Sequence, residues 1–122
     1  MLIKYSQIYA NTDVLSPIDR ETWQVIAEIT KLTPSARVIE LASGKGAFAR
    51  FLAGRFGCRV DGFDVNPDFV EHSTIRAAEQ GLSSLVDFRC HDINSLGVEP
   101  HEYELGVCLG ALYIFREAGW KF

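Results

Sequence analysis

Short apolar stretches alternate with amphipathic ones along the chain, and this pattern predicts strands that alternate with helices. Four apolar stretches have the length of buried strands: 36–41, 58–64, 86–90 and 105–109. Apolar residues at helical spacing predict helices over 46–56 and from 66 to about 80, with Gly57 and Gly81 placed to end them. A strand, a tight turn, a helix and a second strand in this order form a right-handed unit with parallel strands, so we expect an α/β protein.

A further helix is predicted before the first strand. The segment 16–19 resembles a helix start, with a serine N-cap, a proline in the first turn and an acid three residues after the cap. An apolar face follows at helical spacing: Ile18, Thr22, Val25, Ile26 and Ile29. We expect this face to pack on the domain, with Trp23 off it. Residues 1–15 show no sustained period and are expected to form an N-terminal arm, which leaves 16–122 as the domain.

The junction between the first strand and the helix after it has the composition of a ligand-binding turn. Gly44 and Gly46 allow the backbone to approach a ligand closely, and the first helical amides after Gly46 lack partners within the helix. Glu40 is an acid at the carboxyl end of an otherwise apolar strand, where burial is costly unless it meets a donor or a positive charge. A ligand with amino or cationic groups fits this turn better than a phosphate.

Acids also end the next two predicted strands, Asp64 after the second and Asp92 after the third. Carboxyl ends of parallel strands form the edge at which α/β sheets bind ligands, so Asp64 is expected beside the Gly44 turn, where a carboxylate can accept from both hydroxyls of a ribose. Each acid also has a plainer interpretation. Glu40 and Asp64 could be hydrogen-bonded strand-end or turn-capping acids, and Asp92 could start a turn.

Four ordered features together resemble a class I S-adenosylmethionine-dependent methyltransferase: Glu40-Leu41-Ala42-Ser43-Gly44-Lys45-Gly46, Asp64, His91-Asp92-Ile93, and Tyr103-Glu104 before 105–112. The likeness spans residues 16–115. It implies a Rossmann-like, doubly wound parallel sheet with strand order 3-2-1-4 in the part present. The family continues with further helices and three more strands, so the C-terminal strands are expected to be missing and the domain incomplete. Ala42 stands where the family usually has its first glycine.

The resemblance implies S-adenosylmethionine as cofactor and assigns several positions to its methionine part. Glu40 would reach the amino group through water. Four residues would wrap the methionine part and the ribose with their backbone: Ala42, Ser43, Gly44 and Gly46. Leu109 and Gly110 would lie near the methionine backbone and the transferred methyl group.

The remaining assigned positions would hold the adenosine part. Asp64 would bind the ribose hydroxyls, and Val65 would pack on the adenine. Asp92 would accept from the adenine amino group, and Ile93 would offer its backbone amide to the ring. The implied reaction is in-line transfer of the methyl group to an unidentified, small-molecule acceptor, for which positioning alone can supply much of the catalysis, so no catalytic residue is assigned.

Composition and charge limit the classes of partner that the chain can bind and the cellular compartment in which we expect it. A net charge of −4 over 122 residues is unfavourable for binding the phosphate backbone of nucleic acids. No apolar stretch approaches membrane-spanning length, and the N-terminus lacks the apolar core of a signal peptide, so we expect a cytoplasmic protein without membrane or nucleic-acid partners. Cys58, Cys90 and Cys108 lie in or beside predicted strands and are expected to be buried small hydrophobes rather than a disulfide set or a metal site.

Two alternative functions stay open. The segment 44–49 also fits the G-x-G-x-x-A pattern of NAD(P)-binding Rossmann oxidoreductases, with Asp64 about 20 residues further on, although Glu40 and Asp92 have no evident role in such a site. The chain could also be a non-catalytic binding or dimerisation module. Its apolar fourth strand at an open sheet edge favours association with a second copy, which predicts a homodimer.

Overall fold

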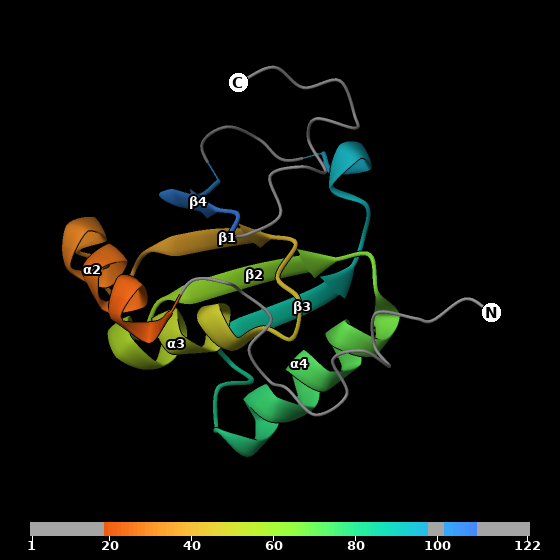
Figure 1. Cartoon of the computed structure of the whole chain (residues 1–122), viewed down its shortest axis with the longest axis horizontal. Coiled ribbons are helices and arrows are strands. Elements are labelled where there is room, and N and C mark those ends of the chain that lie inside the picture. Colours follow the sequence, from red (N-terminus) through yellow and green to blue (C-terminus); the bar gives the residue numbers. More distant parts are fainter. Residues whose placement is uncertain (1–18, 98–101, 110–122) are drawn as a thin grey trace.

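The computed structural model describes residues 19–97 and 102–109. These residues form helices and strands in the following order: α2 (Arg20–Thr30), β1 (Arg37–Leu41), α3 (Ala47–Phe56), β2 (Arg59–Asp64), α4 (Pro67–Glu79), β3 (Val86–Cys90), the 3-10 helix η1 (Ile93–Ser95) and β4 (Leu105–Val107). The strands make one parallel sheet in the order β3-β2-β1-β4 (Figure 1). The α/β class and the strand order 3-2-1-4 are therefore confirmed.

The register of the sheet brings the carboxyl ends of β1, β2 and β3 to one edge. Leu41, the last residue of β1, pairs with Phe63, and Asp64, the last residue of β2, pairs with Cys90, the last residue of β3, so the three strands end side by side. The residues that follow these strands therefore meet at the same edge, which is where the predicted site residues lie.

Helices α3 and α4 pack against the same face of the sheet (Figure 1). The buried core lies between them and the strands, and it is built mainly from small and apolar side chains: Trp23, Ala36, Val38, Phe48, Ala49, Leu52, Ala53, Cys58, Val60, Ala77, Val86 and Phe88. Gly57 ends α3 in a left-handed conformation, and Asn66 caps α4 by accepting from the Asp68 amide. Both helices therefore have the bounds and caps that the sequence indicates.

Helix α2 differs from the prediction in its start and in its buried face. Its N-cap is Asp19, which accepts from the Thr22 amide at 2.9 Å, so the predicted serine cap at position 16 was wrong for this helix. Trp23 is buried, whereas Val25 and Ile29 are 53% and 74% exposed. The Trp23 ring packs against the rings of Phe48 and Phe51 of α3, at centroid distances of 5.4 and 5.5 Å, and this contact decides which face of α2 turns inward.

Strand β4 is fastened to the sheet by the residues just before it. Glu104 accepts from the Arg37 amide through its carboxylate at 2.6 Å, and its own amide donates to the Arg37 carbonyl at 2.9 Å. The Tyr103 hydroxyl donates to Asp61 at 2.6 Å, and burial together with this contact raises the pKa of Tyr103 to about 12. Tyr103 and Glu104 therefore hold the start of β4 against β1 and β2.

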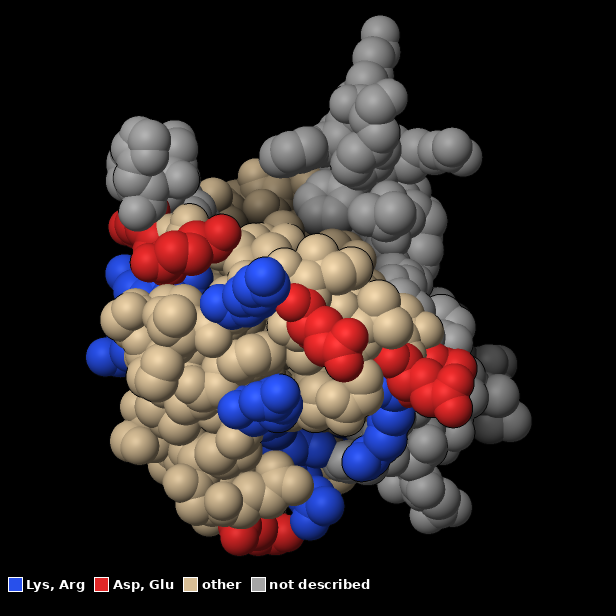
Figure 2. Space-filling model, turned by 90° about the vertical axis from the view of Figure 1, so that its left-hand side faces the viewer, with Lys and Arg blue, Asp and Glu red and all other residues tan. Residues whose placement is uncertain are grey.

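The burial of the cysteines and the distribution of surface charge can be compared with the predictions. Cys58 is buried as expected, and Cys108 is half-buried. Cys90 is exposed because it is the last residue of β3, beyond the buried Val86 and Phe88, so the expectation of burial was wrong there. Acidic and basic side chains are interspersed over the described part of the face in Figure 2. None of the described helices is long and apolar enough to cross a membrane. The predicted arm at 1–15 lies outside the described residues.

Candidate functional site

The turn between β1 and α3 has the backbone geometry that close ligand contact requires. Ala42, Gly44 and Gly46 all have positive φ angles, of 54°, 57° and 76°. The Gly46 amide donates to the Ser43 carbonyl at 2.9 Å and closes the turn, and the Ser43 amide donates to the carbonyl of Phe63 in β2 at 2.9 Å. Ala42 adopts the left-handed conformation that a glycine adopts without strain, at a cost of about 1 kcal/mol.

Asp64 lies beside this turn, as the parallel arrangement of β1 and β2 predicts. Its Oδ2 atom accepts from the Gly44 amide at 2.8 Å, and Oδ1 accepts from the Asn66 amide at 2.9 Å. The carboxylate therefore caps the turn after β2 and also binds the glycine turn. A carboxylate has about four acceptor positions, so these two bonds leave capacity for the hydroxyls of a ligand.

Glu40 is a buried carboxyl group at the carboxyl end of β1. It is 4% exposed, and its Oε2 atom has no hydrogen-bond partner among the residues that the structure describes. Burial, with a smaller contribution from the charge of Asp64, raises the pKa of Glu40 to about 8, while the Ala49 amide and the Arg50 charge oppose this shift. A buried acceptor without a donor is costly, and a cationic or amino group bound at the turn would remove that cost.

We expect the buried Glu40 carboxyl to make the chain less stable as the pH rises. Its pKa is raised from 4.5 in the unfolded chain to about 8 in the folded one, so the folded state binds more protons between these values. The free energy of unfolding should therefore fall from pH 5 towards pH 8, by at most about 1.4 kcal/mol per pH unit. Urea unfolding at several pH values measures this slope.

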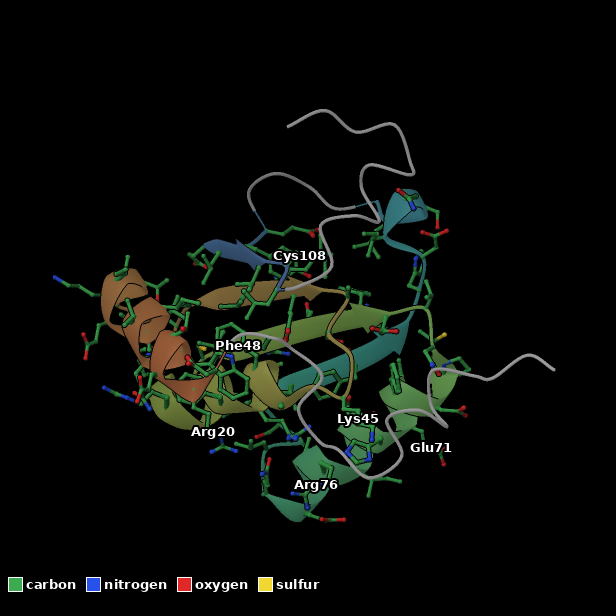
Figure 3. The ribbon with its side chains drawn as sticks, viewed as in Figure 1. Arg20, Lys45, Phe48, Glu71, Arg76 and Cys108 are labelled. Atoms are coloured by element: carbon green, nitrogen blue, oxygen red, sulfur yellow. The ribbon has the colours of Figure 1, made fainter. Side chains whose placement is uncertain are left out.

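The matched variants for this slope are Glu40→Gln and Glu71→Gln. Glu71 lies on the exposed side of α4 (Figure 3). Glu40→Gln should flatten the pH dependence, and Glu71→Gln should leave it as in the wild type. An unchanged slope in Glu40→Gln would assign the pH dependence to another group.

The residues predicted to hold adenosine lie together after β2 and β3. The His91 amide donates to the Asp64 carbonyl at 3.0 Å and joins the two segments. Val65 is 66% exposed, which leaves its side chain available to a flat ring. Asp92 is exposed and caps η1, because its Oδ1 accepts from the Asn94 amide at 2.9 Å. Ile93, the first residue of η1, is half-buried.

The remaining predicted positions lie in the turn and after β4. Ser43 and Gly46 are buried, and Ala42 and Gly44 are half-buried. Leu109 is partly buried and packs against the core. Gly110 lies outside the described residues.

Three buried polar residues next to the turn were missed by the sequence analysis. Lys45, Arg50 and Ser73 are each at most 5% exposed. The Arg50 guanidinium donates to the Lys45 carbonyl at 2.5 Å, and the Ser73 hydroxyl donates to the Gly44 carbonyl at 3.2 Å. Ser73 had a detectable signal, because it stands on the buried stripe of α4 between Phe69 and Ala77, at a spacing of four residues.

Comparison with known proteins gives a consistent result. A family model described as a methyltransferase domain matches residues 38–121. The uncharacterized protein YjhP of Escherichia coli is 26% identical over 99 residues, covering 81% of this chain and 40% of that protein. Geranyl diphosphate 2-C-methyltransferase of Saccharopolyspora erythraea is 29% identical over 79 residues, covering 62% of this chain and 27% of that enzyme.

A solved structure also superposes on the chain. It is a SAM-dependent methyltransferase from Geobacter sulfurreducens in complex with S-adenosylhomocysteine, with a TM-score of 0.79 and 26% sequence identity. The match covers 90% of this chain and 44% of that one. The chain thus spans less than half of the length of these relatives.

Proposed function

The chain belongs to the methyltransferase domain family, and we propose that it is the cofactor-binding part of an enzyme that transfers a methyl group from S-adenosylmethionine to a small-molecule acceptor. The observation that carries this proposal is the buried Oε2 atom of Glu40 near the end of β1, for which residues 19–97 and 102–109 supply no hydrogen-bond partner. It matches a ligand that brings an ammonium group to this edge of the sheet.

The charge of the site separates this cofactor from a dinucleotide. Asp64 ends β2 and Asp92 follows β3, and the cofactor carries a sulfonium and an ammonium group that their carboxylates attract. Burial raises the pKa of Glu40 to about 8, and a cation bound beside it would favour its ionised form. The same acids would repel the negative charge of a pyrophosphate bound at this turn. The NAD(P)-binding alternative is therefore disfavoured by electrostatics.

Different residues of the site would bind different parts of the cofactor. Glu40 would accept from the ammonium group, directly or through water, while the backbone of the turn would surround the methionine part and the ribose: Ala42, Ser43, Gly44 and Gly46. Asp64 would accept from the ribose hydroxyls with the acceptor positions that Gly44 and Asn66 leave unused. Leu109 and Gly110 would lie near the transferred methyl group.

The adenine would lie over the segments that follow β2 and β3. Val65 offers an exposed apolar surface for the ring, and Asp92 and Ile93, in the segment after β3, would contact its polar edge. When bound, S-adenosylmethionine supplies an electrophilic methyl group on a sulfonium. The chain's own contribution is to bind and orient the cofactor so that an acceptor can approach in line.

The proposed acceptor rests on a relative, and the proposed location and partner rest on the sequence. The name of the Saccharopolyspora relative supports a small organic acceptor. A cytoplasmic location and a second copy of the chain paired along β4 stay predictions.

Isothermal titration of the chain with S-adenosylhomocysteine tests the proposal. We expect saturable binding to one site, and no heat of binding with NAD in a parallel titration. Binding of NAD without binding of S-adenosylhomocysteine would overturn the proposal in favour of the dinucleotide alternative.

A further inference from the structure

The peptide groups on both sides of Gly44 are held by side chains from different elements. On one side, the Gly44 amide donates to Oδ2 of Asp64, at the end of β2, at 2.8 Å. On the other, the Gly44 carbonyl accepts from the hydroxyl of Ser73, on α4, at 3.2 Å. Because these groups belong to the two peptide planes that meet at the Gly44 Cα atom, the two bonds together restrain its φ and ψ angles.

Ser73 is placed so that its hydroxyl reaches only protein groups. Its side chain is fully buried, and the hydroxyl contacts the Gly44 carbonyl and, at 2.8 Å, the Phe69 carbonyl one turn earlier in α4. One hydroxyl proton is thus shared between the helix and the turn. The turn lies against α4 at this point, where Lys45 is seen beside the helix (Figure 3).

Packing around Gly46 supports the same contact. A Cβ atom placed on Gly46 would lie 2.8 Å from the Ser73 Cβ and 2.7 Å from the Phe88 ring. The turn therefore packs directly against Ser73 and Phe88, with no room for an added Cβ atom. This packing keeps the Ser73 hydroxyl opposite the Gly44 carbonyl. The bond and the packing act on neighbouring residues of one turn.

From these contacts we propose that Ser73 is a positioning residue of the cofactor turn, which sets the conformation of Gly44 before the cofactor binds. This inference rests on the proposed function, because it concerns the same turn. A preformed turn loses less conformational freedom when the ligand binds, so removal of the restraint should weaken binding. Ser73 itself need not touch the cofactor.

The structure provides a control on the same helix. Thr74, the next residue, donates its hydroxyl to the Val70 carbonyl at 2.9 Å, which is the same bond to the preceding turn that Ser73 makes with Phe69. Thr74 is exposed and reaches no part of the cofactor turn. Thr74→Ala therefore removes the helix bond alone, whereas Ser73→Ala removes the helix bond and the contact with Gly44.

The experiment measures two properties of the wild type, Ser73→Ala, Ser73→Cys and Thr74→Ala: the affinity for S-adenosylhomocysteine and the hydrogen exchange of the Gly44 and Gly46 amides without ligand. We expect Ser73→Ala to bind about three- to tenfold more weakly and its two turn amides to exchange faster by a similar factor. Ser73→Cys fills the same position with a slightly larger side chain that is a much weaker donor, so it should show the same losses. Thr74→Ala should match the wild type.

Each other outcome has a distinct meaning. If the wild type binds and Ser73→Ala matches Thr74→Ala in both properties, the inference about Ser73 is wrong and the proposed function stands. If Ser73→Cys restores wild-type values, packing and not the hydrogen bond positions the turn, and the inference is also wrong. If the folded wild type does not bind S-adenosylhomocysteine, the proposed function fails and takes the inference with it.

Discussion

Gly46→Ala is expected to destabilise the folded chain by about 2–4 kcal/mol, because two costs add at this position. Gly46 has a φ angle of 76°, which strains any residue with a Cβ atom, and the new Cβ would lie 2.7 Å from the Phe88 ring and 2.8 Å from the Ser73 Cβ. Neither neighbour can move easily, since both are buried. Urea unfolding of the wild type and the variant measures the difference.

Gly54→Ala is the matched control for this substitution. Gly54 lies within α3, the helix that follows the turn, and has an ordinary helical φ angle. A Cβ atom added there would meet no described atom within 4 Å outside its chain neighbours and the backbone of its own helix. Alanine at this position should stabilise the chain by about 0.5–1 kcal/mol, because glycine is the poorer helix former. Equal stability of Gly46→Ala and the wild type would show that the turn can shift away from Phe88 at no cost.

Asp64→Ala is expected to weaken the binding of S-adenosylhomocysteine by about a hundredfold. The carboxylate would contribute charge-assisted hydrogen bonds to the ribose, each worth about 1.5–3 kcal/mol, and it already holds the Gly44 amide at 2.8 Å. Its removal would therefore cost both a ligand contact and a restraint on the turn. Isothermal titration gives the affinity, and urea unfolding of the same samples gives the change in stability.

Two further variants separate these contributions. Asp64→Asn keeps one carbonyl oxygen that can accept from Gly44, so it should retain more of the stability while it loses most of the affinity. Asp68→Ala removes an exposed acid from the first turn of α4, a few residues away, and should leave the affinity unchanged. An affinity in Asp64→Ala within threefold of the wild type would remove Asp64 from the cofactor site.

Much of the fold, and the position of Asp64 beside the glycine turn, could be predicted from short-range patterns. The strands, the bounds of α3 and α4, and the glycine turn depend on residues that are close in sequence, such as Gly57 and Asn66 at the helix ends. The position of Asp64 beside Gly44 followed from the handedness of the strand–helix–strand unit, which leaves one arrangement for parallel strands.

Other features depended on contacts between residues far apart in the sequence, and only the tertiary structure decided them. The inward face of α2 was set by the aromatic side chains of α3, so Trp23 is buried and Val25 is exposed, against the helical pattern. Cys90 is exposed at the end of β3, whereas Val86 and Phe88 in the same strand are buried, because the packed core reaches only part of this strand.

The sequence by itself determined the class of fold, the turn and the acids that end the strands, because local spacing and chirality are sufficient for these. The tertiary structure decided the properties that depend on burial. It left Glu40 with a raised pKa and with one oxygen that has no partner within the described part of the chain, and it brought the Ser73 hydroxyl of α4 to Gly44, 29 residues away. Burial depends on how elements pack, and a side chain's own sequence neighbours do not specify that packing.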